Sequence, residues 1–168
     1  MQIIKLSPIK PYHKQLCNLL IDSVESNASV GFLPPLSTDE ADDYWLSVDR
    51  ECYAENKVLL VATENNHVLG AVQLALNTKK NGSHRGEVEK LMVHSSARGK
   101  GTGKQLMLAL EQHAIDLDKK LLVLDTREGD VASSLYKKLG YTVAGIIPDF
   151  ALSSTGQLDG TVIFYKQI

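Results

Sequence analysis

The sequence predicts a mixed α/β fold, in which a central twisted sheet of about seven strands is flanked by about four helices. Three observations predict it. Apolar runs of strand length alternate with helical apolar stripes along the chain. Three strand-like runs follow one another between residues 57 and 93. A later run, Leu121–Leu124, is continuously apolar, as a strand buried on both faces would be. We expect one domain over residues 1–168.

The N-terminal part is predicted to form a short strand and two helices. Ile3–Leu6 has the apolar composition of a strand. Pro11 suits the first turn of a helix, and apolar residues then recur at helical spacing as far as Val24. A glycine and a proline pair interrupt regular structure between residues 27 and 36. Ser37–Glu40 has the pattern of a capping box and predicts the start of the second helix.

Three strands are predicted in the middle of the chain. Lys57–Thr63 and His67–Leu76 are separated by a turn at Asn65 and Asn66, which predicts an antiparallel hairpin. His84–Val93 is the third run and follows a polar turn.

Helices and strands alternate in the C-terminal part. Residues Gly101–Leu117 carry an apolar stripe, which predicts a helix before the strand at Leu121–Leu124. Another helix is marked by Val131, Leu135 and Leu139. Gly140 occupies its C-cap position. The last strands are predicted at residues 141–147 and 161–165, so the sheet must combine parallel and antiparallel pairs.

The composition excludes several classes of function. The formal net charge is -2, whereas a nucleic-acid binder is usually basic. Cys17 and Cys52 form no CxxC pair, and the five histidines show no HExxH spacing, so we expect no metal site. The N-terminal residues lack the apolar run of a signal peptide, and no stretch reaches the ~18 apolar residues of a membrane span. We therefore expect a cytoplasmic protein that binds neither nucleic acid nor membrane.

The most informative motif is ARGKGTGK, residues 97–104, between a predicted strand and a predicted helix. Free backbone N–H groups at a helix start attract anions, and glycines let the backbone approach them closely. Three cations, Arg98, Lys100 and Lys104, add positive charge. The loop predicts a phosphate site, and a plain flexible turn is the alternative.

Two familiar phosphate motifs do not fit this loop. A P-loop needs glycine where Arg98 stands and Ser or Thr where Gln105 stands. A dinucleotide fingerprint needs a third glycine where Lys104 stands. The spacing that fits is [R/Q]-x-x-G-x-[G/A], carried by Arg98, Gly101 and Gly103.

Longer segments of the sequence resemble those of a known protein family. EVEKLMVHSSARGKGTGKQLM, followed by LLVLDT and ASSLYKKLGY, resembles the GNAT N-acetyltransferase superfamily. With ASVGFLPPLSTDEADDYW near the N-terminus, the chain is most similar to the tabtoxin-resistance type. The match follows the element order of the whole chain and is strongest from Glu87 to Tyr141. Many members place an asparagine in the turn before the last helix, but here Arg127–Asp130 contains none.

The resemblance implies acetyl-CoA as the cofactor, with its pyrophosphate on the glycine loop. It also implies a GNAT-like sheet that splays between its fourth and fifth strands. The pantetheine arm is then expected to take the place of a missing strand beside Leu91, Met92 and Val93. The loop residues expected to bind the cofactor are Arg98, Gly99, Lys100, Gly101, Thr102, Gly103 and Lys104.

The resemblance implies direct attack of a primary amine on the thioester. Glu87 and Asp125 are the candidate bases, and Glu89 shares the strand face of Glu87. Which carboxylate acts stays open, because each has an ordinary reading as a solvated edge residue or a turn cap. Tyr136 is the candidate acid, and packing on the helix flank is its alternative. A ping-pong route through Cys17 or Cys52 is the less favoured mechanism.

The acceptor is expected to lie against the N-terminal half. Phe32 and Trp45 could form an apolar shelf for it, although a core position for Trp45 is the plainer reading. Our first choice of acceptor is a small amino-acid-like amine, with toxins and antibiotics among the candidates. The alternatives are a protein amine, a non-catalytic acyl-CoA sensor and an unrelated nucleotide-phosphate binder. A homodimer fits the prevalence of dimers.

Overall fold

The computed structural model describes residues 1–168 and contains seven strands and four α-helices. The helices are α1 (His13–Glu25), α2 (Thr38–Tyr53), α3 (Thr102–Asp116) and α4 (Ala132–Lys138). The strands are β1 (Gln2–Lys5), β2 (Lys57–Glu64), β3 (His67–Leu76), β4 (Arg85–Val93), β5 (Leu121–Arg127), β6 (Thr142–Leu152) and β7 (Leu158–Gln167). This order confirms the predicted succession of elements.

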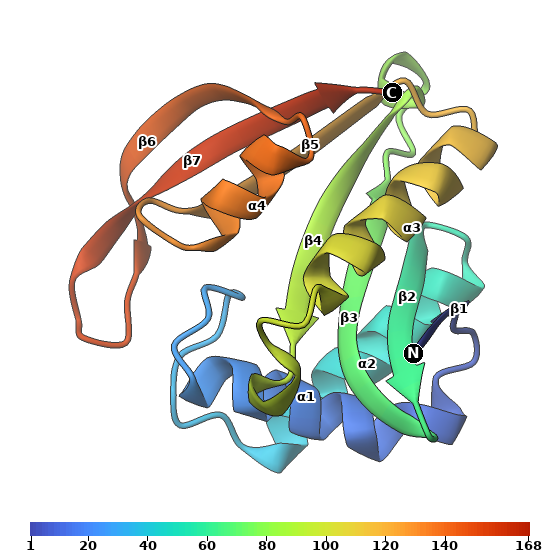
Figure 1. Ribbon diagram of the computed structural model, residues 1–168, viewed down its shortest axis with the longest axis vertical. Coiled ribbons are helices and arrows are strands. Elements are labelled where there is room, and N and C mark those ends of the chain that lie inside the picture. The colour runs from blue at the N-terminus through green and yellow to red at the C-terminus, as the bar shows by residue number, and fades with distance from the viewer.

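The strands form one sheet in the order β1-β2-β3-β4-β5-β7-β6 (Figure 1). Only β4 and β5 pair in parallel, and every other pair is antiparallel. The parallel pair is short, since it joins only Arg85–Glu87 to Leu121–Val123. Figure 1 shows the two strands diverging beyond this shared end. The predicted mixed fold and its splay between the fourth and fifth strands are therefore confirmed.

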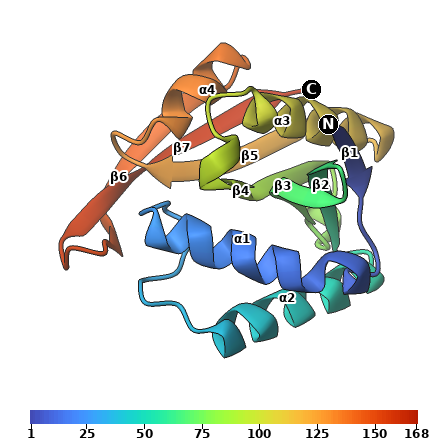
Figure 2. The ribbon, with the colours of Figure 1, turned by 60° about the horizontal axis from the view of Figure 1, so that its bottom comes forward.

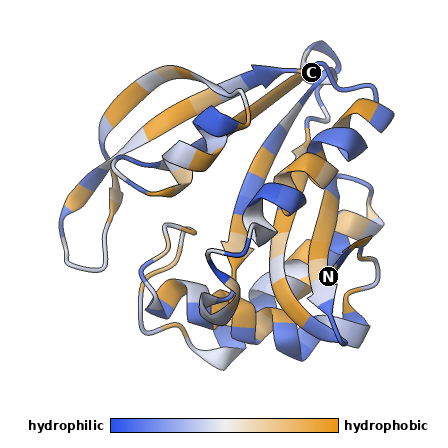
Figure 3. Ribbon diagram, in the orientation of Figure 1, coloured by the Kyte–Doolittle hydropathy of each residue, from blue (hydrophilic) through white to orange (hydrophobic).

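The helices cover both faces of the sheet (Figure 2). Helices α1 and α2 lie on one face, where Leu16, Leu19 and Trp45 are fully buried. Helices α3 and α4 lie on the other, where Leu106 and Leu110 are fully buried. Figure 3 shows hydrophobic residues running along β2 and β3, the strands enclosed between these layers. No helix combines the length and the apolar composition needed to cross a membrane.

Local signals in the sequence account for the boundaries of several elements. The Ser37 hydroxyl accepts a hydrogen bond from the Glu40 amide, and Glu40 Oε2 accepts one from the Ser37 amide, which completes the predicted capping box. Asn65 and Asn66 both have positive φ, as a two-residue hairpin turn requires. Gly140 ends α4 with a φ of 86°.

Three local expectations were wrong. The strand at Leu121–Leu124 is not buried on both faces, because Leu121 and Val123 are only half-buried while Leu122 and Leu124 are buried. Val131 does not join the apolar stripe of α4, since it precedes the helix and is 86% exposed. Strands β6 and β7 extend well beyond the predicted segments, and β6 is an exposed edge strand.

Candidate active site

The splay between β4 and β5 opens into a cleft of about 1140 Å³. Its floor is formed by the unpaired half of β4 and the end of β5. The loop between α1 and α2 forms one wall, and the first turn of α3 together with α4 forms another. Splayed strands leave backbone groups without partners, and such groups favour a ligand that completes the ladder.

The glycine loop enters this cleft at the start of α3. Gly99 and Gly101 have φ values of 75° and 84°, and a Cβ at either position would meet no atom within 4 Å. The backbone N–H groups of residues 99–104 find no acceptor within the protein. Open left-handed glycines, unpaired amides and a helix N-terminus are together suited to bind an anion.

The three cations of the loop differ in the contacts they make within the protein. Arg98 Nε donates to the Val93 carbonyl at 3.0 Å, and its guanidinium also donates to the Ser26 hydroxyl. Lys100 Nζ donates to the Ser96 carbonyl at 3.1 Å. Lys104 is exposed and makes no such contact. Arg98 thus ties the loop to the end of β4 and to α1, besides adding positive charge to the cleft.

Strand β4 carries a bulge where it borders the cleft. Ala71 pairs with Met92 and Gln73 pairs with Glu89, so Lys90 and Leu91 together face a single residue of β3. Lys90 adopts a φ of 52°, which is unusual for a residue other than glycine. The Met92 side chain is buried in the core, so only its backbone can meet a ligand.

Three carboxylates approach the floor of the cleft, and they differ in their partners. Glu89 accepts a hydrogen bond from Lys57 Nζ at 2.6 Å and forms an ion pair with it. Asp125 accepts one from the Thr161 hydroxyl at 2.9 Å. Glu87 has no partner of either kind and stays exposed to the cleft, and partial desolvation followed by the negative charges of Glu89 and Asp125 raises its pKa. A free carboxylate with a raised pKa is suited to act as a base.

Glu87 and Asp125 lie on the same face of the sheet. Glu87 is in register with Val123, and Asp125 follows two residues later on β5. Since side chains alternate along a strand, the two carboxylates point the same way across the opening splay. Sequence reasoning paired these two residues, and the register brings them together.

Tyr136 lies at the end of the cleft nearest α4. Its side chain is only 6% exposed, and its ring packs against Tyr141 and Phe164. Its hydroxyl makes no hydrogen bond within the protein, yet it is not enclosed and borders the cleft. Burial raises the pKa of Tyr136, so the hydroxyl stays protonated at neutral pH.

The two residues expected to form the acceptor shelf separate in the structure. Phe32 lines the cleft and packs edge-to-face on Tyr44. Trp45 is 0% exposed and does not line the cleft, so the expectation that it contacts the acceptor was wrong. It lies on the buried face of α2, beneath Tyr44.

Cys17 and Cys52 are also remote from this chemistry. Neither lines the cleft. Burial, with the nearby Asp42 carboxylate, raises the pKa of Cys17 to about 11, and burial raises the pKa of Cys52 as well. A protonated, distant thiol is a poor nucleophile, so the geometry does not support the ping-pong route.

Sequence reasoning missed Lys90. Its ammonium lies in the cleft beside Gly31, 3.3 Å from where a Cβ on that glycine would stand. No carboxylate lies within ion-pair distance of it. The alternation of EVEKLMV gives no sign of a bulge, so the direction of Lys90 could not be read from the sequence.

The open, glycine-rich helix start and the splayed parallel pair together match the fold that the sequence resemblance implied. Residues 19–141 match the Acetyltransferase (GNAT) family, and the chain belongs to this family. It is an N-acetyltransferase, as the family match and a curated relative show.

Two of the similar proteins are named for different acceptors. Glucosamine 6-phosphate N-acetyltransferase of Schizosaccharomyces pombe is 32% identical over 85 residues, which are 49% of this chain and 75% of that protein. The structure of ribosomal-protein-alanine N-acetyltransferase from Brucella melitensis has a TM-score of 0.85, 19% identity and 100% coverage of both chains. The structure of yncA from Salmonella typhimurium with its cofactor acetyl-CoA has a TM-score of 0.80 and 20% identity, with 99% of this chain and 94% of that chain covered.

Proposed function

We propose that this N-acetyltransferase acts on a small amine that also carries an anionic group, such as an amino-acid-like compound. The observation that carries the proposal is Lys90, an ammonium in the cleft without an ion-pair partner. Burial lowers the pKa of Lys90, which reflects the cost of keeping its charge away from water. A carboxylate or phosphate on the acceptor would remove that cost, since a charge-assisted hydrogen bond replaces the lost water.

The acceptor would lie between β4 and the loop that joins α1 to α2. Gly31 stands next to the Lys90 ammonium on this loop, and Phe32 adds an apolar contact. The relative from S. pombe is named for glucosamine 6-phosphate, which also combines an amine with an anionic group. The resemblance to the tabtoxin-resistance type likewise supports a small, amino-acid-like acceptor.

The residues of the cleft fit acetyl-CoA as the acetyl donor. The free amides of residues 99–104 would hold its diphosphate, and the unpaired edge of β4 at Leu91–Val93 would receive its pantetheine arm. Bound there, acetyl-CoA supplies a thioester carbonyl that an uncharged amine can attack.

We infer that Glu87 is the base that removes the proton from the acceptor amine. Glu89 is neutralised by Lys57, and Asp125 is held by Thr161, so Glu87 is the carboxylate free to accept a proton. Its raised pKa brings its basicity closer to that of the amine. Asp125 would then orient the amine or the water that relays its proton.

We infer that the Tyr136 hydroxyl donates a hydrogen bond to the departing sulfur. Its raised pKa makes it a weak acid but keeps its proton in place. Replacing Tyr136 with phenylalanine is expected to lower kcat by roughly 10²-fold. The KM for acetyl-CoA should stay the same, because the diphosphate site is elsewhere. Steady-state kinetics measure both, and an unchanged kcat from pH 6 to pH 9 would remove Tyr136 from the mechanism.

Release of free thiol from acetyl-CoA, measured with a panel of amines, tests the proposed function. The panel pairs amino acids and amino-sugar phosphates with their uncharged analogues, and adds peptides with free N-termini. We expect turnover with the small anionic amines. Turnover with peptides alone would favour a protein acceptor, and no turnover with any amine, despite acetyl-CoA binding, would favour a sensor.

The variant Lys90→Met tests the acceptor class. A charge-assisted hydrogen bond contributes about 1.5–3 kcal/mol, so the KM for anionic acceptors is expected to rise roughly 10- to 100-fold. The KM for acetyl-CoA and for uncharged analogues should not change, and Lys90→Arg should restore part of the affinity. An unchanged KM for the anionic acceptors would contradict their proposed class and leave the family assignment intact.

A further inference from the structure

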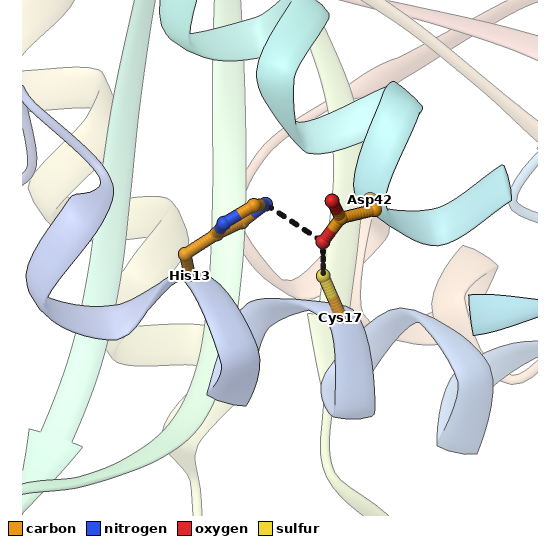
Figure 4. Close-up of side chains that lie close together, drawn as sticks. All are labelled: His13, Cys17 and Asp42. Carbon is orange, nitrogen blue, oxygen red and sulfur yellow. Dashed lines mark hydrogen bonds and ion pairs between the residues drawn. The ribbon is translucent and has the colours of Figure 1, made fainter. Parts of the chain in front are cut away.

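Helices α1 and α2, on the face of the sheet opposite α3 and α4, bring together three metal-ligating side chains (Figure 4). His13 and Cys17 are four residues apart on α1 and share one face of it, while Asp42 reaches them from α2. Their ligand atoms lie within 4.8 Å of one another. None of the three lines the cleft, so the acetyl-transfer site does not explain them.

The two distances to Asp42 in this cluster suit a tetrahedral zinc ion. His13 Nε2 is 3.3 Å from Asp42 Oδ1, and Cys17 Sγ is 3.6 Å from the same oxygen. Zinc bonds of about 2.0 Å to nitrogen and oxygen and about 2.3 Å to sulfur, at tetrahedral angles, separate such pairs by about 3.3 and 3.5 Å. Two of the three separations therefore match a tetrahedral zinc ion, and His13 Nε2 and Cys17 Sγ, which lie within 4.8 Å of each other, would come to about 3.5 Å on binding.

One atom of the cluster lacks a partner. His13 Nε2 is buried and makes no hydrogen bond, because its closeness to Asp42 is not matched by hydrogen-bond geometry. A buried polar atom without a partner is costly, and a coordinated cation would supply one. The Asp42 side chain is 50% exposed, so an ion and a completing water can reach the site from solvent.

We propose that His13, Cys17 and Asp42 form a zinc site whose fourth position is taken by water. Imidazole and thiolate ligands favour zinc over magnesium or calcium, which prefer oxygen. Binding would transfer the thiol proton of Cys17 to solvent. The composition led us to expect no metal site, because Asp42 lies 25 residues beyond Cys17 on another helix and leaves no compact motif.

Such an ion would cross-link α1 and α2, the two helices on either side of the loop that is proposed to contact the acceptor. Residues 26–37 connect α1 to α2 and form a wall of the cleft. The ion lies away from the reacting groups, so its expected role is to stabilise this helical layer. Binding to the native state alone raises its stability, and zinc should therefore raise the melting temperature.

The full chain, stripped of metal with a chelator, is titrated with zinc sulfate in a calorimeter and with Co²⁺ in an absorption spectrometer. We expect one zinc ion per chain and a thiolate-to-cobalt absorption band. Cys17→Ala and Asp42→Asn each remove a direct ligand, so each should lose at least the roughly 10- to 100-fold in affinity that removal of an outer-shell partner costs, and each should abolish or shift that band. Cys52→Ala is the matched control, because Cys52 is the other free cysteine and lies outside the cluster, so it should bind like the wild type.

Two results would overturn the proposal. The wild type could bind no zinc, in which case the cluster is an ordinary hydrogen-bonded contact. It could also bind zinc no more tightly than Cys17→Ala and Asp42→Asn do, which would place the ion elsewhere on the surface. If Cys17→Ala fails to fold, the zinc affinity of Asp42→Asn alone tests the site. This variant should fold, because Asp42 is half-exposed and asparagine has nearly the same shape.

Discussion

The variant Glu87→Gln is expected to lower kcat/KM by about 10²–10⁴-fold, the usual contribution of a positioned base. Glutamine keeps the shape of the side chain but cannot accept the proton of the acceptor amine. Glu87 has no ion-pair partner, so the substitution breaks no contact within the protein. The loss should therefore appear in turnover and not in the KM for acetyl-CoA, and steady-state kinetics with both substrates separate the two.

The pH dependence gives a second measurement of the same role. A base works only when deprotonated, so activity should rise as pH increases through the pKa of Glu87. Partial desolvation and the charges of Glu89 and Asp125 raise that pKa, which places the acidic limb of the kcat/KM profile above the usual glutamate value of about 4.3. Glu87→Gln should abolish this limb. If Asp125→Asn abolishes it and Glu87→Gln does not, Asp125 is the base.

Stability measurements exclude misfolding as the cause of the loss. The folded-state pKa of Glu87 lies above its unfolded value, so the folded protein binds this proton more tightly. Stability is then lost as pH rises through the interval between the two pKa values. At neutral pH the ionised Glu87 is destabilising, and Glu87→Gln should melt at the same temperature as the wild type or slightly higher. A lower melting temperature would mean that Glu87 also has a structural role.

The sequence predicted the features that depend on neighbouring residues. The capping box at Ser37, the hairpin turn at Asn65 and Asn66 and the glycine at the end of α4 are local signals, and each takes the expected conformation. The glycine loop is local as well, and its positive φ angles agree with the reading of Gly99 and Gly101. Its diphosphate-binding role stays a prediction.

Features that depend on distant residues could not be predicted. Lys57 neutralises Glu89 from 32 residues away, so the sequence could not tell which carboxylate stays free. The bulge that turns Lys90 into the cleft arises from the register between β3 and β4. Trp45 was a candidate for the acceptor shelf beside the plainer core reading, because an aromatic side chain on a helix looks the same in sequence whether it is buried or exposed, and the core reading is the one the structure bears out.

The variant Gly101→Val is expected to weaken acetyl-CoA binding roughly 100-fold or more. Gly101 has a φ of 84° at the N-cap of α3, and valine is strongly disfavoured in that region. Relaxing the strain would turn the neighbouring amides away from the diphosphate, and the new side chain would occupy the open space in front of them. Losing two charge-assisted hydrogen bonds of about 1.5–3 kcal/mol each accounts for the magnitude. Calorimetric titration with acetyl-CoA measures it.

Gly156→Val separates this effect from a general loss of stability. Gly156 has a φ of 83°, and no atom lies within 4 Å of its Cβ position, so its backbone strain matches that of Gly101. It lies in the turn between β6 and β7 and does not line the cleft. Each variant should lose roughly 2 kcal/mol of unfolding free energy in urea, since a left-handed conformation costs an L-residue about that much. Only Gly101→Val should lose acetyl-CoA affinity. Equal losses of affinity would show that strain, and not the position of Gly101, weakens binding, and the glycine loop would no longer be the diphosphate site.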